Sequence, residues 1–381
     1  MATGSIREIR TKSGEIHYQI TIDGGRDPLT GKRNRAFRNI KGSKREAKSL
    51  MHKLITEMEE GKITKKSSKN IGEWMDEWLS EYMPNIEETT RIGYQNKIKC
   101  YIKPAIGDIL IQSLTASHVQ RMVNDMTRRG LSPKNIRDTF NNVNAAMKLA
   151  AKTRLIPYNP CEGVSLPKRK KYKAEVYSTE MINSLLTKTE GTDMYLPILI
   201  LVSAGLRRGE LLALRWQDID FENKILKVRK NMVRGLNGYI IKPPKTEAGI
   251  RDISLGDSVM QKLVFAKEHY DKKKLAYGIG FQDLDFVISK SDGAPFSPDA
   301  MTRKWRRFLV SNGLPEIRLH DLRHSNATAL IQAGVNPRVV QQRLGHSDVN
   351  ITLNTYTHVL SSMDMEAADK LDMLLLNHEK N

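Results

Sequence analysis

The first 65 residues carry the alternating pattern of a small β-sheet, followed by the pattern of one helix. In residues 15–23 every second position is apolar, as in a strand with one buried face: Ile16, Tyr18, Ile20 and Ile22. Turn-forming residues follow, and the alternation resumes over residues 34–40. Ser43 and Glu46 have the spacing of a helix capping box, and an apolar stripe behind them predicts an amphipathic helix that ends near Gly61: Ala47, Leu50, Leu54 and Met58.

Residues 70–166 show helical periodicity in four stretches. The first has large apolar residues at helical spacing: Ile71, Trp74, Trp78 and Tyr82. Helical patterns follow over residues 88–102, 115–129 and 132–153. The short connections predict a compact bundle with the aromatic residues in its core. Prolines end the bundle, and a basic linker follows that either lies along a phosphate backbone or is a solvated connector: Lys168, Arg169, Lys170 and Lys171.

Residues 174–381 mix helical and strand patterns. Ser178 is placed as the N-cap of a helix, and residues 195–206 are apolar throughout, as in a buried helix. Residues 224–232 and 238–255 are expected to be strands of one small sheet. Residues 330–348 predict two helices around a glycine turn, a pattern that resembles a helix-turn-helix. The chain is therefore expected to be multidomain and mainly α, with small β-sheets.

Composition narrows the class of protein. The 381 residues carry a formal net charge of +19, which favours an anionic partner, most often nucleic acid. The two cysteines, Cys100 and Cys161, are far apart, which fits a reducing cytoplasm better than a disulfide scaffold. The N-terminus lacks the apolar core of a signal peptide, and the longest apolar run is too short to span a membrane. We expect a bacterial cytoplasmic, nucleoid-associated protein.

Two groups of residues could bind an anion. Arg207 follows the apolar helix, and Glu210 lies one turn later, so the two form either a structural ion pair or part of an anion site. His320 and Arg323 share a helix face, an arrangement that makes sense around a phosphate. With His324 they also give an H-D-x-x-H pattern similar to that of zinc peptidases. A positive Arg323 would oppose a metal ion, however, and no third ligand has a familiar spacing.

Three further residues are ordinary when each is considered alone. Lys245 is expected at a strand-turn-strand junction, where an exposed lysine is common. His346 and Tyr356 lie in a polar segment with little core-forming sequence between them, where a half-buried tyrosine and a turn-capping histidine would be unremarkable. A tyrosine hydroxyl has a pKa of about 10 and is a poor nucleophile without help from its surroundings.

Their order along the chain is not ordinary. Arg207, Lys245, His320, Arg323, His346 and Tyr356 stand within "GLRRGE", "KT", "LHDLRHS", "LGHS" and "NTYTH". This set resembles the tyrosine recombinases, the integrase family of phages and conjugative transposons. The resemblance implies three domains: an N-terminal arm-type DNA-binding sheet and helix (1–65), a helical SAM-like core-binding domain (70–166) and a mixed α/β catalytic domain (174–381).

The resemblance also implies a role for each residue. Tyr356 would attack the scissile phosphate and form a 3′-phosphotyrosyl link, while Arg207 and Arg323 hold the two non-bridging oxygens. His346 would add a donor, and His320 would lie near the tyrosine hydroxyl as a base or positioning group. Lys245 would protonate the leaving 5′ oxygen, although Lys242 is a second candidate. Glu210 would support Arg207, and His324 would pack. No metal, cofactor or ATP is expected.

The implied partners are double-stranded DNA with core and arm-type sites, accessory DNA-bending or excisionase proteins, and other copies of the chain, with no membrane. A C-terminal helix with the stripe Ala368, Leu371 and Leu375 would dock on a neighbouring subunit in a tetramer, or else pack on its own domain. The expected reaction is integration and excision of a mobile element. The alternative is a helix-turn-helix regulator without catalysis, for which the six-residue set would have no use.

Overall fold

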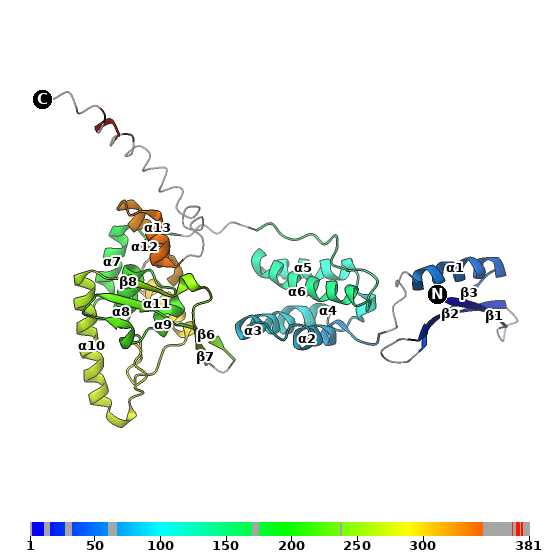
Figure 1. Cartoon of the computed structure of the whole chain (residues 1–381), viewed down its shortest axis with the longest axis horizontal. Helices are drawn as coiled ribbons and strands as arrows, with labels where there is room; N and C mark the ends of the chain where they lie inside the picture. Colours follow the sequence, from blue (N-terminus) through cyan, green and yellow to red (C-terminus); the bar gives the residue numbers. More distant parts are fainter. Residues whose placement is uncertain are drawn as a thin grey trace. The chain divides into compact units, whose positions relative to one another are not determined.

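The computed structural model describes residues 2–10, 16–26, 33–59, 67–169, 175–236 and 238–345, together with 368, 371–373 and 375. The chain divides into two compact units, Met1–Lys171 and Tyr172–Asn381 (Figure 1). Among the described residues no helix is both long and apolar enough to cross a membrane. His346 and Tyr356 lie outside the described residues.

The chain begins with an antiparallel sheet of order β1-β2-β3 and one helix packed on it. The elements are β1 (Thr3–Arg10), β2 (Ile16–Arg26), β3 (Arg33–Lys41) and α1 (Lys44–Glu59). The expected capping box is present, since the Ser43 amide donates to Glu46 at 2.7 Å and the Glu46 amide donates to Ser43 Oγ at 3.3 Å. Strand β1 was not predicted, because this largely exposed edge strand has too few apolar positions to show an alternation.

Residues 70–152 form helices, as their periodicity predicts. They are α2 (Ile71–Glu81), α3 (Glu88–Lys97), a π-turn (Ile98–Ile102), α4 (Lys103–Ile106), a 3-10 turn (Ile111–Ser113), α5 (Ala116–Arg128) and α6 (Pro133–Lys152). Trp74 and Trp78 are buried in their common core, and the Trp74 indole donates to the Ala146 carbonyl at 3.1 Å. Tyr82 is less buried than predicted: it is 44% exposed, and its ring lies at the edge of the core, 5.7 Å from the Trp74 ring between centroids.

The second unit is a helical layer around small sheets. Its helices are α7 (Thr179–Thr189), α8 (Tyr195–Ala204), α9 (Arg208–Ala213), α10 (Asp257–Tyr277), α11 (Pro298–Ser311), α12 (Leu319–Gln332) and α13 (Pro337–Leu344). Its strands are β4 (Ile219–Asp220), β5 (Ile225–Val228), β6 (Asn231–Gly235), β7 (Gly238–Lys242) and β8 (Arg251–Ser254). Short 3-10 turns cover Trp216–Asp218, Glu247–Gly249 and Gly278–Gly280.

The prediction of a single small sheet in this unit is wrong, because the strands form two separate sheets. One has the order β4-β5-β8, and the other is the hairpin β6-β7. The first ladder ends at the pair Val228 and Arg251. There the Arg229 guanidinium donates to the carbonyls of both residues, at 3.2 and 3.0 Å. The Arg229 side chain thus occupies the two carbonyl acceptors at the end of the β5-β8 ladder. Strand β6 does not extend this ladder and pairs with β7 instead.

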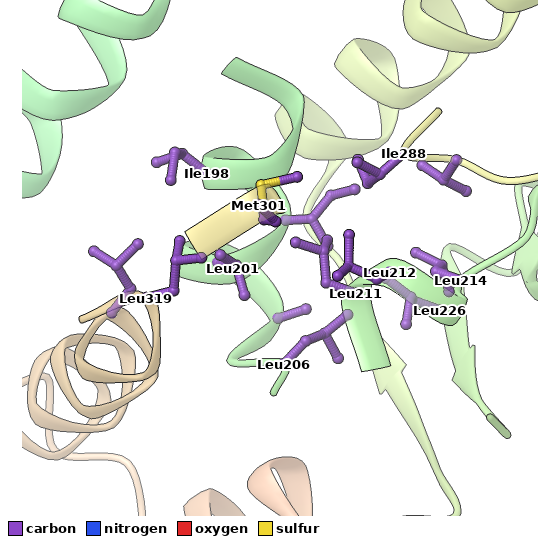
Figure 2. Close-up of a cluster of buried hydrophobic side chains, with 14 of the residues drawn as sticks. Ile198, Leu201, Leu206, Leu211, Leu212, Leu214, Leu226, Ile288, Met301 and Leu319 are labelled. Carbon is purple, nitrogen blue, oxygen red and sulfur yellow. The ribbon is translucent and has the colours of Figure 1, made fainter. Parts of the chain in front are cut away.

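Helix α8 is the centre of the second unit. It is apolar on all sides, and such a helix is stable only when other elements surround it. Figure 2 shows Ile198 and Leu201 from α8 beside Leu211 and Leu212 from α9 and Met301 from α11. The position of α8 matters for the site, because the turn at its C-terminus leads directly to Arg207.

Each unit contains a buried tryptophan whose indole N–H donates to a main-chain carbonyl. Trp74→Phe should destabilise the helical bundle by about 1–3 kcal/mol, because it removes a buried hydrogen bond to the Ala146 carbonyl and leaves a gap in the packed core. Trp305→Phe is the matched control in the other unit, where the indole donates to Ile317 at 2.7 Å. Calorimetry of the whole chain should show two unfolding transitions. Each variant should lower the melting temperature of the transition that belongs to its own unit. A shift of the same transition by both would contradict the division into two units.

Candidate phosphate-binding site

A glycine turn sets the position of Arg207. Gly205 ends α8 in the left-handed conformation, with φ of 65°. A Cβ there would lie 2.7 Å from the Leu344 side chain and 2.8 Å from the Asn326 Oδ1 atom. Only glycine satisfies both the dihedral angle and the close approach. The chain therefore turns sharply, and Arg207 becomes the N-cap residue of α9.

The Arg207 guanidinium is held from two sides. Its Nη1 donates to Glu210 at 2.7 Å, and its Nη2 donates to the Gly345 carbonyl at 3.0 Å. Both interpretations that the sequence left open are therefore compatible with the structure. Arg207 forms the ion pair with Glu210, and its side chain is still 37% exposed, so the guanidinium also presents surface to an anion.

Glu210 is a carboxylate buried between two arginines. Its Oε1 accepts from Arg207, and its Oε2 accepts from Arg251 at 2.9 Å and from the Arg207 amide at 2.9 Å. Burial by itself raises the pKa of Glu210, but the hydrogen bonds and charges of Arg251 and Arg207 outweigh that effect and lower the pKa below its usual range. Glu210 is therefore ionised at neutral pH.

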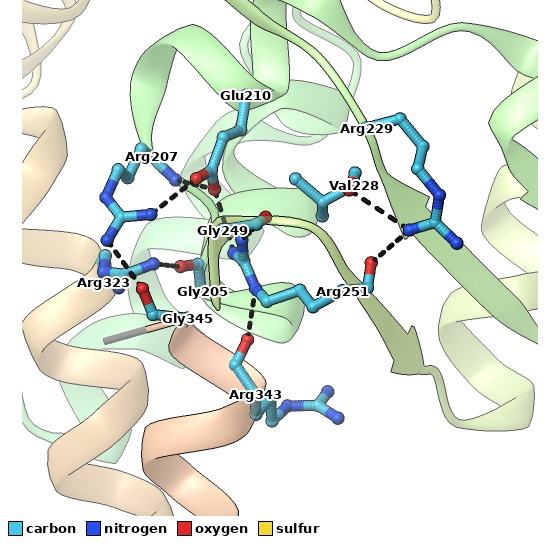
Figure 3. A network of polar contacts seen from close by, with 10 residues as sticks. All are labelled: Gly205, Arg207, Glu210, Val228, Arg229, Gly249, Arg251, Arg323, Arg343 and Gly345. Atoms are coloured by element: carbon cyan, nitrogen blue, oxygen red, sulfur yellow. Dashed lines mark hydrogen bonds and ion pairs between the residues drawn. The ribbon is translucent and has the colours of Figure 1, made fainter. Parts of the chain in front are cut away.

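Arg251 is the residue of this network that the sequence interpretation missed. It begins β8, and only 6% of its side chain is exposed. Its guanidinium donates to Glu210, to the Gly249 carbonyl and to the Arg343 carbonyl (Figure 3). A signal was present, because Arg251, Ile253 and Leu255 alternate with polar residues, and an arginine in the inward register of a strand needs partners.

Arg323 lies at the same turn as Arg207. It projects from α12 and donates to the Gly205 carbonyl at 2.8 Å, so the structure brings the two predicted arginines to one bend of the chain (Figure 3). Unlike Arg207, Arg323 is almost fully buried, with 1% of its surface exposed. Arg323 therefore exposes much less surface than Arg207.

His320 and His324 stand on consecutive turns of α12, with their rings edge to face at 5.1 Å. Desolvation by the surrounding protein lowers the pKa of His320 to about 4, helped by repulsion from His324 when that ring is protonated and by the positive charges of Arg323 and Arg318, although part of the residue is exposed. The pKa of His324 is lowered too, first by burial. Both rings are neutral at pH 7. Among the described residues no group of histidine, cysteine and acidic side chains is suited to a metal ion.

Lys245 lies in the connection from β7 to β8, the strand-turn-strand junction that the sequence predicted. It is not at the tip of the β6-β7 hairpin, which falls between Gly235 and Gly238. Pro243 and Pro244 end β7, because proline has no N–H for a ladder. Lys245 is exposed, whereas the alternative Lys242 is half-buried at the end of β7.

The segment that leads to His346 is anchored beside Arg207. Gly345 ends α13 in the left-handed conformation, with φ of 68°, and a Cβ there would lie 2.5 Å from the Ala248 carbonyl. Its own carbonyl accepts from Arg207. His346 and Tyr356 themselves lie outside the described residues. In the tail, Leu371 and Leu375 are 55% and 65% exposed.

The expected pair of helices around a glycine turn is present as α12 and α13. The pair is built into the site, since Arg343 donates to the Ser254 and Ser203 carbonyls and α12 packs on α8. This integration disfavours the regulator alternative, in which the second helix would serve mainly to enter a DNA groove.

Comparison with known proteins identifies the family. Residues 175–363 match the phage integrase family, and residues 70–127 match the N-terminal SAM-like domain of phage integrases. The chain is 30% identical to the ICEBs1 integrase of Bacillus subtilis over 371 residues, which cover 94% of this chain and 97% of that protein. It is 28% identical to a XerC-like tyrosine recombinase of Caldanaerobacter subterraneus, over 96% of this chain and 98% of the relative.

Solved structures share the fold. The Tn1549 transposon integrase in complex with transposon right end DNA has a TM-score of 0.66 at 24% identity, covering 78% of this chain and 99% of that one. A lambda integrase dimer bound to a core site has a TM-score of 0.57 at 20% identity, covering 91% and 93%. The mainly helical, multidomain architecture predicted from the sequence is confirmed. The chain belongs to the phage integrase family, and it is a tyrosine-type site-specific DNA recombinase.

Proposed function

We propose that this recombinase integrates and excises a mobile element by cleaving double-stranded DNA through Tyr356. The observation that carries the proposal is the convergence of Arg207, Arg323 and the Gly345 turn at the end of α8, directly before His346 in the sequence. Relatives named for their elements include the ICEBs1 integrase and the Tn916 transposase, and the family's chemistry requires donors of this kind around one phosphate.

In the proposed reaction the Tyr356 oxygen attacks the scissile phosphorus and the bond to the 5′ oxygen breaks. A 3′-phosphotyrosyl ester forms and keeps the bond energy, so rejoining needs no ATP. Arg207 and Arg323 bind the non-bridging oxygens, where charge increases in the transition state, and His346 adds a further donor. Lys245, or Lys242 in its place, supplies the proton to the leaving oxygen. The donors come from the protein, so the mechanism requires no metal or cofactor.

His320 acts in this proposal as a neutral imidazole near the tyrosine hydroxyl. A ring whose pKa is about 4 carries no proton at neutral pH, so it can accept a hydrogen bond from the tyrosine hydroxyl but is a weak base for the proton itself, which leaves to the surrounding water. The neighbouring Arg323 and Arg318 disfavour a second positive charge there. They thereby keep the imidazole neutral, which favours a role in positioning the hydroxyl over a role as the base.

The proposal also assigns a different DNA contact to each of three domains. Residues 1–65 bind arm-type sites through the exposed sheet face, residues 70–166 bind core sites, and residues 174–381 carry out catalysis in the bacterial cytoplasm. The exposure of Arg35 and Phe37 on β3 supports a surface on the sheet that contacts DNA. The exposed Leu371 and Leu375 support a tail that docks on a neighbouring copy in a tetramer. Accessory DNA-bending or excisionase proteins would set the direction.

Tyr356→Phe tests the nucleophile. Loss of the hydroxyl should abolish the covalent protein–DNA product and leave DNA binding unchanged, because phenylalanine keeps the ring but has no attacking oxygen. A nicked suicide substrate carrying candidate element ends, followed by denaturing electrophoresis, measures the product. Tyr277→Phe, at a tyrosine that is 49% exposed on α10, is the matched control and should cleave normally. Covalent product from the Tyr356 variant would assign the nucleophile to another residue.

The lowered pKa of His320 predicts a pH effect on stability. In the unfolded chain His320 gains a proton below about pH 6.5, whereas in the folded chain it does so only near pH 4. The free energy of unfolding therefore decreases as the pH falls through this window. His320→Asn should therefore reduce the loss of melting temperature between pH 7 and pH 5. Carboxylates with lowered pKa values, such as Glu210, begin to add to this loss of stability only at lower pH. An unchanged pH dependence in the variant would show that His320 has an ordinary pKa.

Removal of residues 1–66 tests the arm-binding role of residues 1–65. A chain that starts at Ser67 should cleave core sites but bind less tightly to DNA that carries flanking arm sites. The slope of log affinity against log salt should become shallower by roughly one unit for each phosphate group that the shortened chain leaves unbound. Titrations on DNA with and without arm sites measure both effects. Equal affinities and slopes for the two proteins on arm-site DNA would assign the N-terminal sheet to a protein partner instead.

A further inference from the structure

Arg251 connects three segments that approach the site from different parts of the sequence. Its Nη2 donates to Glu210 at 2.9 Å, its Nη1 donates to the Gly249 carbonyl at 3.0 Å, and its Nε donates to the Arg343 carbonyl at 2.7 Å. Glu210 belongs to the helix that Arg207 caps, Gly249 ends the turn that follows Lys245, and Arg343 lies in the last turn of α13 before His346.

These bonds close a ring with Arg207. Arg207 donates to Glu210 and to the Gly345 carbonyl, while Arg251 donates to the same Glu210 and to the Arg343 carbonyl. The guanidinium groups of Arg207 and Arg251 thus both donate to carbonyls at the C-terminal end of α13 and share the Glu210 carboxylate (Figure 3). The ring fixes where Arg207 stands relative to the turn that precedes His346.

Burial protects the Arg251–Glu210 side of the ring. The side chains of Arg251 and Glu210 are 6% and 1% exposed, so water cannot replace a hydrogen bond that is broken. Gly345 leaves little room for adjustment, because a Cβ on it would lie 3.2 Å from the Arg251 Nη1 atom. Lysine cannot reproduce the arrangement, since one ammonium lacks the planar fork that reaches three acceptors in fixed directions.

We propose that Arg251 is a positioning residue for DNA cleavage: it holds Arg207 and the turn before His346 in the geometry that binds the scissile phosphate. The inference rests on the proposed role of Arg207. Arg251 is buried and acts only through its neighbours. Displacement of a phosphate-binding group by about 1 Å slows a reaction by on the order of 100-fold, so disruption of the ring should reduce the cleavage rate without preventing DNA binding.

Arg251→Lys is the main test, because it keeps a positive charge beside Glu210 and removes the bridging geometry. Single-turnover cleavage of the suicide substrate should slow by on the order of 100-fold, with unchanged affinity for core-site DNA. Arg229→Lys is the matched control from the neighbouring strand. Arg229 contacts the carbonyl of Arg251 and the exposed Asp252, and its lysine variant should cleave at the wild-type rate.

A double-mutant cycle with Arg207→Ala separates positioning from a general structural role. If Arg251 acts through Arg207, the double variant should be slower than Arg207→Ala by much less than the factor that Arg251→Lys causes alone. Full multiplication of the two factors would mean that Arg251 acts independently of Arg207, and would overturn the inference. All rates are taken below the onset of unfolding, with Arg251→Gln as a second substitution if the lysine variant does not fold.

The same experiment distinguishes failure of this inference from failure of the proposed function. Slow cleavage by Arg207→Ala together with wild-type cleavage by Arg251→Lys would reject only the positioning role. Wild-type cleavage by Arg207→Ala would reject the assignment of Arg207 to the phosphate, and the positioning role of Arg251 with it.

Discussion

The buried carboxylate of Glu210 is the interaction on which the site depends. An ionised carboxylate in the interior is costly unless cations and hydrogen bonds surround it, and Glu210 receives them from both Arg207 and Arg251. The two arginines in turn are held in place by this one acceptor. Removal of Glu210 would leave the buried Arg251 without an anionic partner, and removal of Arg251 would take from Glu210 its buried cation, so the three residues depend on one another. The catalytic segment of the chain is organised around these three residues.

Close approach of main-chain segments makes this cluster of Arg207, Glu210 and Arg251 possible. Gly205 and Gly345 both take left-handed conformations, and a Cβ on either would meet its neighbours at less than 3 Å. Their carbonyls accept from Arg323 and Arg207, respectively. The apolar helix α8 and the short helix α13 therefore end beside each other, and their last residues supply acceptors to arginines from other elements. Packing of the core and placement of the charged groups are consequences of the same two turns.

The sequence predicted the features that depend on local pattern or on a motif. The helix stripes of residues 70–152, the caps at Ser43 and Ser178 and the buried helix at 195–206 all follow from short-range rules. Features set by tertiary pairing were missed. The strand β1 is an exposed edge, the division into two sheets depends on long-range strand pairing, and two of the three partners of Arg251, Glu210 and the Arg343 carbonyl, come from distant positions. The roles of the six motif residues stay predictions, because their chemistry was inferred from the family resemblance.

Concentration of positive charge has opposite effects on arginine and histidine at this site. Arginine keeps its charge at any physiological pH, so buried arginines give a fixed field suited to the extra negative charge of a phosphoryl transition state. Desolvation by the surrounding protein, and then the same field, lower the pKa of His320 and keep its ring neutral. One cluster therefore contains permanent cations and an uncharged imidazole next to them, the combination on which the proposed reaction depends. A protonated ring at His320 would be repelled by the neighbouring arginines, whereas a neutral ring can accept a hydrogen bond from a tyrosine hydroxyl without adding charge to the cluster.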